Sequence, residues 1–244
     1  MQFMTLNLLK LFSILSVILF SDCEKKEKME PVESYIVHTP INTTGVSYLA
    51  LGDSYTKAEC DILTNSYPYK LTEKFQAMGI KVSSRTIIAQ TGWRTDNLKD
   101  AIDAASLEDT FDLVSLLIGV NNQFQGKSPE NYRLEFRDLL ATAVYYAKGR
   151  KDKVFVLSIP DYGATPFGSR NPTYIGQQID LFNAINKEVT DSMGVKYFDI
   201  TPLSRDAKKD ATLTCKDNLH PSGKMYGRWV DLMLPEVVSM VAKL

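Results

Sequence analysis

Short runs of apolar residues alternate along the chain with amphipathic segments that have helical spacing. The apolar runs predict buried strands at residues 46–51, 81–89, 111–118, 154–159 and 195–200. The segments between and after them predict helices at residues 67–78, 95–105, 129–148, 174–192 and 222–244. Pro235 is expected to kink or split the last helix. Five strands alternating with helices predict an α/β fold in which helices cover both faces of a parallel sheet.

Residues 1–22 have a different pattern and predict a signal peptide. Residues 11–20 are apolar apart from two serines, a length that suits a secretory signal better than a membrane span. Cys23 follows, and the segment resembles a bacterial lipoprotein signal, in which this cysteine is lipidated. Asp22 departs from that pattern, which prefers a small neutral residue. A cleaved secretory signal and an uncleaved anchor are the alternatives, and all three place the protein outside the cytoplasm.

Residues 23–44 are expected to form a tether between the membrane and one domain at residues 45–244. The segment is charged, contains two prolines and has few periodic apolar positions. Residues 35–37 are expected to add at most a short contact with the domain. His38 is interpreted as a solvated linker residue, because no second metal-type ligand is near it in the sequence.

Net charge and cysteine content bear on the binding partners and on the compartment of the protein. The formal net charge is −1 and no long basic run is present, which argues against nucleic-acid binding. If Cys23 carries lipid, Cys60 and Cys215 remain as a pair in an oxidising compartment and are expected to form a disulfide. Two unpaired buried thiols are the alternative.

Glycines and polar residues follow several predicted strands. Ser54 comes after the first strand, Gly92 after the second and Asn121 after the third, and Asp217 and His220 precede the last helix. Ligands of open α/β sheets bind at the carboxyl ends of the strands. These residues are therefore expected to converge at one edge of the sheet.

The residue types at this edge suit nucleophilic catalysis. A serine hydroxyl such as that of Ser54 is a weak nucleophile unless a base removes its proton. His220 can be that base, and a carboxylate such as Asp217 can orient its ring and stabilise the imidazolium. The backbone N–H groups of Ser54 and Gly92 and the amide of Asn121 can stabilise an oxyanion.

The four segments resemble the four sequence blocks of the SGNH hydrolases, also called the GDSL esterase/lipase family. In family order they are Gly52-Asp53-Ser54, Gly92, Gly119-Val120-Asn121-Asn122 and Asp217-Asn218-Leu219-His220. The resemblance implies a three-layer, flavodoxin-like fold with strand order 2-1-3-4-5. It also implies Ser54 as nucleophile, His220 as base, Asp217 as its acid, and Gly92 and Asn121 as oxyanion donors, without a metal or cofactor. Asn122 stands where the family usually has aspartate, which leaves the hydrogen bonding of that loop open.

The expected function is an extracytoplasmic serine esterase that works through an acyl-enzyme. A lysophospholipid or short-acyl ester is one expected substrate, and an acetylated carbohydrate is the alternative. Four aromatic residues near the active edge can line the substrate site or simply pack the loops: Trp93, Phe124, Tyr162 and Phe167. Residues 160–172, with two glycines and three prolines, predict a mobile or irregular flap.

Functions of other classes stay open to different degrees. A catalytically inactive binding module on the same fold and an acyltransferase with the same triad are the main alternatives. A phosphate or flavin binder is disfavoured, because the loop after the first strand lacks a glycine-rich run. An α/β-hydrolase is disfavoured as well, because Ser54 does not lie in a Gly-x-Ser-x-Gly elbow.

Overall fold

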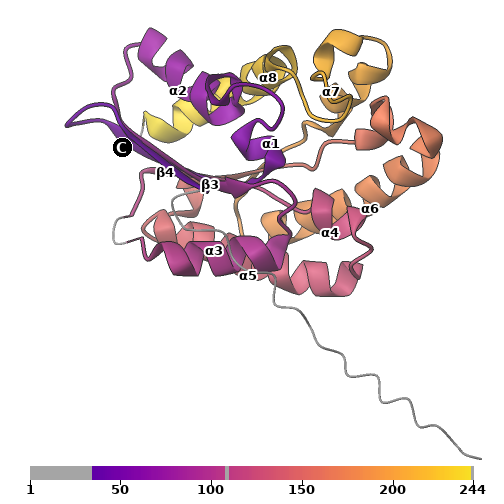
Figure 1. Ribbon diagram of the computed structural model, residues 1–244. Helices are drawn as coiled ribbons and strands as arrows, with labels where there is room; N and C mark the ends of the chain where they lie inside the picture. Colours follow the sequence, from indigo (N-terminus) through magenta and orange to yellow (C-terminus); the bar gives the residue numbers. More distant parts are fainter. Residues whose placement is uncertain (1–34, 108–109, 243–244) are drawn as a thin grey trace, which may run out of the picture.

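Helices cover both faces of a central sheet in the computed structural model, which describes residues 35–107 and 110–242 (Figure 1). One face carries α3, α5 and α6, and the other carries α2 and α8. Their bounds are Tyr67–Ala77 for α2, Thr95–Ala105 for α3, Pro129–Tyr146 for α5, Pro172–Ser192 for α6 and Gly223–Val241 for α8. The predicted three-layer α/β fold is therefore confirmed. The predicted signal peptide, Cys23 and residues 23–34 of the tether lie outside the described residues.

The sheet has six strands in the order β1-β3-β2-β4-β5-β6. Their bounds are Ile36–Pro40, Val46–Asp53, Val82–Gln90, Leu113–Leu117, Val154–Leu157 and Lys196–Phe198. The five strands from β2 to β6 pair in parallel. Their order corresponds to 2-1-3-4-5 when they are numbered from β2, as the family resemblance implies. The central strands are buried on both faces, which explains their nearly continuous apolar sequences.

The sixth strand, β1, was not predicted. It pairs antiparallel with β3, with Ile36 opposite Ile88. The prediction of a tether is therefore wrong for residues 36–40. This edge strand has five residues and is only partly buried, so its sequence lacks the apolar run that marks the inner strands. His38 lies within it and is exposed, and its Nδ1 is hydrogen-bonded to the Thr86 hydroxyl at 2.8 Å.

Strand β2 carries the chain to the predicted nucleophile. It does not end at residue 51, as predicted from the sequence, but continues through Gly52 to Asp53. A Cβ atom at position 52 would lie 2.5 Å from the carbonyl oxygen of Leu117 on β4. Glycine is therefore needed here for close packing of the two strands rather than for ending β2.

Several short helical elements at the carboxyl edge were not predicted from the spacing of apolar residues. They are α1 (Ser54–Lys57), α4 (Val120–Phe124), α7 (Thr201–Arg205) and the 3-10 turns η4 (Tyr162–Ala164) and η5 (Phe167–Arg170). The predicted flap at residues 160–172 is irregular, because the two 3-10 turns make up most of it. Pro235 lies inside α8, which continues to Val241 and is not split. Within the described residues, no helix has the length and apolarity needed to cross a bilayer.

Candidate active site

Ser54 lies directly after β2, at the carboxyl edge of the parallel strands. It is the first residue of α1, and Asp53 caps this short helix by accepting a hydrogen bond from the Tyr55 N–H at 3.0 Å. The first N–H groups of a helix have no partner within the helix. The backbone N–H of Ser54 therefore has no partner within α1, and it lies next to the hydroxyl of the same residue. Ser54 itself is 4% exposed.

Asp217 and His220 are joined within one turn before α8. The Nδ1 of His220 lies 2.6 Å from Asp217 Oδ2, and Asp217 Oδ1 accepts the backbone N–H groups of Leu219 and His220, each at 3.0 Å. Partial burial raises the pKa of Asp217, but these hydrogen bonds outweigh it and hold the pKa below its usual value. The ionised carboxylate orients the imidazole, which leaves Nε2 for proton transfer.

The predicted oxyanion donors, Gly92 and Asn121, lie in the segments that follow β3 and β4. Gly92 has a φ of +85°, a conformation that favours glycine. The Asn121 amide donates a hydrogen bond to the Trp93 carbonyl at 2.9 Å, and Gln125 donates one to the Gly92 carbonyl at 3.3 Å. These bonds hold the Gly92 loop against α4. Because an amide nitrogen carries two hydrogens, the bond to Trp93 occupies only one of the two on Asn121.

Asn122, the departure from the family pattern, is 1% exposed and hydrogen-bonded. Its Oδ1 accepts the Thr95 N–H at 3.1 Å, and its Nδ2 donates to the Thr95 hydroxyl at 2.6 Å. The same Nδ2 lies 3.4 Å from the Glu135 carboxylate, which also accepts the Thr95 hydroxyl. The network joins α4 to α3 and α5, so asparagine satisfies the hydrogen bonding of this loop.

Ser54, Gly92, Asn121 and His220 line one cavity of about 130 Å³. The structure thus brings the four predicted residues together, with Asp217 behind His220. The remaining lining residues are Thr91 and six apolar or aromatic side chains: Tyr55, Val120, Phe124, Tyr162, Phe167 and Leu219. The Tyr55 ring packs edge-on against the His220 ring at a centroid distance of 5.7 Å.

Three of the four aromatic residues predicted near the site form a cluster at this cavity. The ring centroids of Phe124 and Tyr162 are 5.9 Å apart, and that of Phe167 lies 6.3 Å from Phe124. Phe124 and Phe167 are 57% and 50% exposed, so their rings are accessible to a ligand. Trp93 is not among the lining residues, because its ring packs against Tyr35 at 5.0 Å.

Cys60 and Cys215 form a disulfide, as predicted, with their Cα atoms 6.1 Å apart. The bridge lies beside the turn that holds Asp217 and His220, since the Cys215 N–H donates to the His220 carbonyl at 2.7 Å. These two cysteines and Asp217 are the one cluster of metal-type ligands within the described part of the chain. The disulfide occupies both sulfur atoms and Asp217 holds His220, so the cluster does not suit a metal ion.

Sequence reasoning missed Tyr55 and Leu219, which line the cavity, and Thr95 and Glu135, which support it. Leu219 lies between Asp217 and His220, so its place beside the base follows from the motif. The contacts of Thr95 and Glu135 with Asn122 depend on how α3 and α5 pack, so no local sequence pattern predicts them.

Residues 50–228 match the model of the GDSL-like Lipase/Acylhydrolase family. The chain belongs to this family. The match covers every segment of the candidate site, from Ser54 to His220. No curated protein sequence matches the chain.

Solved structures include several with the same fold as this GDSL-family chain. TesA is 16% identical, covers 80% of this chain and 99% of its own, and has a TM-score of 0.64. The psychrotrophic esterase EstA from Pseudoalteromonas sp. is 15% identical, covers 80% and 98% of the two chains, and has a TM-score of 0.63. The acetylxylan esterase Axe2 from Geobacillus stearothermophilus is 18% identical, covers 80% and 94%, and has a TM-score of 0.62.

Proposed function

We propose that the protein is a serine esterase that hydrolyses carboxylic esters through an acyl-enzyme intermediate. One observation carries the proposal: Ser54, His220 and two candidate oxyanion donors line a single cavity, and Asp217 binds the far side of the His220 ring. Membership of a lipase and acylhydrolase family supports the same reaction.

The proposed reaction has two halves. Ser54 Oγ attacks the ester carbonyl while His220 Nε2 takes its proton, and the carbonyl oxygen becomes an oxyanion that the Ser54 and Gly92 N–H groups and the Asn121 amide stabilise. The bond to the alkoxy oxygen breaks, and His220 returns the proton to the leaving alcohol. Water then attacks the acyl-enzyme with His220 again as base, which releases the acid and restores Ser54.

A short-acyl ester is the proposed substrate class, because most side chains lining the cavity are apolar or aromatic. A carbohydrate O-acetyl ester is a second candidate. The exposed rings of Phe124 and Phe167 favour it, since each can stack on a sugar ring, and the similar fold of the acetylxylan esterase Axe2 is consistent with it.

The proposed location is outside the cytoplasm, with the chain anchored through a lipid on Cys23. The Cys60–Cys215 disulfide supports an oxidising compartment. The anchor itself rests on the resemblance of the sequence around Cys23 to a lipoprotein signal.

Hydrolysis of p-nitrophenyl acetate and butyrate tests the proposed reaction. Ser54→Ala removes the attacking oxygen and is expected to lower kcat/KM by at least about a thousandfold, because the rest of a triad does not replace the nucleophile. A matched control is Ser169→Ala, which changes an exposed serine on η5 and is expected to leave the rate unchanged. If Ser54→Ala retained most of the wild-type rate while keeping its melting temperature, the assignment would be wrong.

A further inference from the structure

Two cavities share side chains beside the catalytic turn. The first is the cavity that contains Ser54 and His220, and the second, of about 20 Å³, lies toward α7 and α8. The second cavity is lined by Ala207, Leu213 and Met225 among others. Tyr55, Tyr162 and Leu219 line both cavities. These three side chains therefore form a partition between them.

The first cavity offers few polar groups beyond the proposed catalytic ones. Its remaining side-chain hydroxyls are those of Thr91, which donates to the Glu59 carboxylate, and of the two tyrosines, Tyr55 and Tyr162. A sugar ring bound there would leave hydroxyl groups without partners, which costs free energy in a buried site. An apolar acyl chain has no such requirement. The lining thus favours the acyl part of an ester inside the cavity and the alcohol part outside it.

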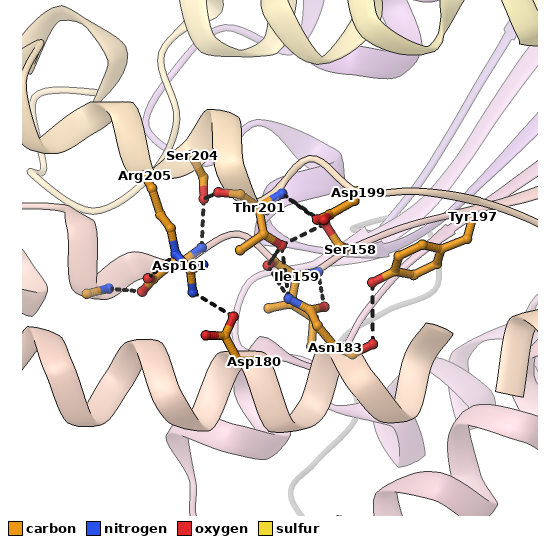
Figure 2. A network of polar contacts seen from close by, with 11 residues as sticks. Ser158, Ile159, Asp161, Asp180, Asn183, Tyr197, Asp199, Thr201, Ser204 and Arg205 are labelled. Atoms are coloured by element: carbon orange, nitrogen blue, oxygen red, sulfur yellow. Dashed lines mark hydrogen bonds and ion pairs between the residues drawn. The ribbon is translucent and has the colours of Figure 1, made fainter. Parts of the chain in front are cut away.

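Tyr162 is the firmly held side of the partition. It follows Asp161, whose carboxylate binds Arg205 Nε at 2.9 Å and whose N–H donates to Ser204 Oγ at 2.9 Å (Figure 2). Arg205 also binds Asp180 on α6 at 2.6 Å (Figure 2). Asp161 is 3% exposed, so breaking its ion pair would leave a buried charge unpaired. This network fixes the loop that carries Tyr162.

The same loop is tied to the catalytic turn. The Phe167 N–H donates to the Asn218 carbonyl at 3.0 Å. Tyr55 is also held, since its ring packs against both His220 and Trp229 and is 3% exposed. Both tyrosines are therefore fixed by contacts on more than one side.

Leu219 differs from the two tyrosines because its side chain is only half-buried, whereas both tyrosine rings are buried. Its backbone N–H binds Asp217 Oδ1, and this bond does not depend on the side chain. We propose that Leu219 ends the acyl-binding cavity and limits the acyl chain length, so that a smaller side chain joins the two cavities and admits longer acyl groups. This inference rests on the proposed esterase function.

Chain-length selectivity of the Leu219 variants tests it. The readout is the ratio of kcat/KM for p-nitrophenyl octanoate to that for p-nitrophenyl butyrate, measured with the full chain. Leu219→Ala is expected to raise the ratio at least about tenfold, mainly through a lower KM for octanoate, since each newly buried methylene gives about fourfold in binding. Leu219→Phe places a larger side chain in the partition, which shortens the acyl-binding cavity, and it is expected to lower the ratio.

Leu203→Ala is the matched control. Leu203 is half-buried on α7 and packs against the same core, but it lines neither cavity. Its ratio is expected to stay at the wild-type value. Ratios unchanged in both Leu219 variants, with esters still hydrolysed, would overturn the inference and leave the esterase function standing. Should Leu219→Ala fail to fold, the direction of the Leu219→Phe ratio decides. A wild-type protein that hydrolyses no ester would instead overturn the proposed function.

Discussion

Asp53 carries a carboxyl group into the core next to the proposed nucleophile. The residue is fully buried, and its Oδ1 accepts the Tyr55 N–H. Its Oδ2 has no hydrogen-bond partner within the part of the chain that the structure describes. Burial raises the pKa of Asp53 from 3.8 to about 7, although hydrogen bonds from the backbone lower it. Burial also raises the pKa of the neighbouring Tyr67 to about 12, so this phenol stays neutral where Asp53 titrates.

This shift predicts a pH-dependent stability. Between about pH 4 and pH 7 the unfolded chain has lost the Asp53 proton while the folded chain still holds it, so the free energy of unfolding falls as the pH rises. Asp53→Asn removes the titrating group. Its free energy of unfolding, relative to wild type, is expected to increase by up to about 4 kcal/mol from pH 4 to pH 8. Urea unfolding across this range measures the difference. Parallel pH curves for the two proteins would contradict the prediction.

At position 122 an uncharged side chain faces a carboxylate on a neighbouring helix. Glu135 on α5 places its carboxylate 3.4 Å from Asn122 Nδ2. An aspartate at position 122, as is usual in the family, would face Glu135 with a like charge. The pair Asn122 and Glu135 therefore keeps one carboxylate in the network around Thr95, where two would repel each other.

A double-mutant cycle tests this pairing. Asn122→Asp is expected to lower the free energy of unfolding by about 1–3 kcal/mol because of the like charges, and to lower kcat as α4 shifts. Adding Glu135→Gln to that variant should restore most of both losses, whereas Glu135→Gln alone should not raise activity. Chemical unfolding and ester hydrolysis provide the two measurements. Additive losses in the double variant would show that the two residues are not paired.

At the scale of elements, the disulfide connects the segment after α1 to the turn before α8. Its cysteines are 155 residues apart in the sequence. The Asn218 N–H donates to the Cys215 carbonyl at 3.0 Å, and the Cys215 N–H donates to His220. The covalent link therefore joins the part of the chain that follows Ser54 to the turn that carries the proposed base.

Replacing both cysteines with alanine is expected to affect stability and turnover together. Opening so long a loop costs about 5 kcal/mol in the chain-entropy account of disulfides. We expect kcat to fall more than KM rises, because the turn with Asp217 and His220 loses its anchor while the substrate cavity keeps its other walls. Thermal unfolding and steady-state kinetics at a temperature where both proteins are folded test this. A stable variant with wild-type kcat would refute the positioning role.

The sequence predicted those elements that bury a long apolar surface and missed those that do not. Strands such as Leu113–Leu117 are buried along their length, so their apolar runs identify them. Strand β1 is a partly buried edge of five residues, and α4 is shorter than two helical turns. The four candidate segments were predicted to meet because loops that follow parallel strands share an edge. The contact between Trp93 and Tyr35 could not be predicted, because the periodicity of apolar residues does not specify which side chains meet.

At the scale of the whole molecule, the sheet assembles the site from distant parts of the chain. Ser54 follows β2, Gly92 follows β3 and Asn121 lies after β4, while His220 comes from the turn before α8. No single element contains more than one part of the proposed machinery, except the Asp217–His220 turn. The arrangement therefore depends on the parallel order β3-β2-β4, which places all these loops on one edge.

The central claim is that Ser54 is a nucleophile activated by His220. The most direct measurement is mass spectrometry of the protein after reaction with a fluorophosphonate, which phosphonylates activated serines. We expect one adduct per chain, located on the peptide that contains Ser54, formed far more slowly in His220→Ala and absent in Ser54→Ala. An unmodified wild-type protein, or an adduct that persists in Ser54→Ala, would contradict the claim.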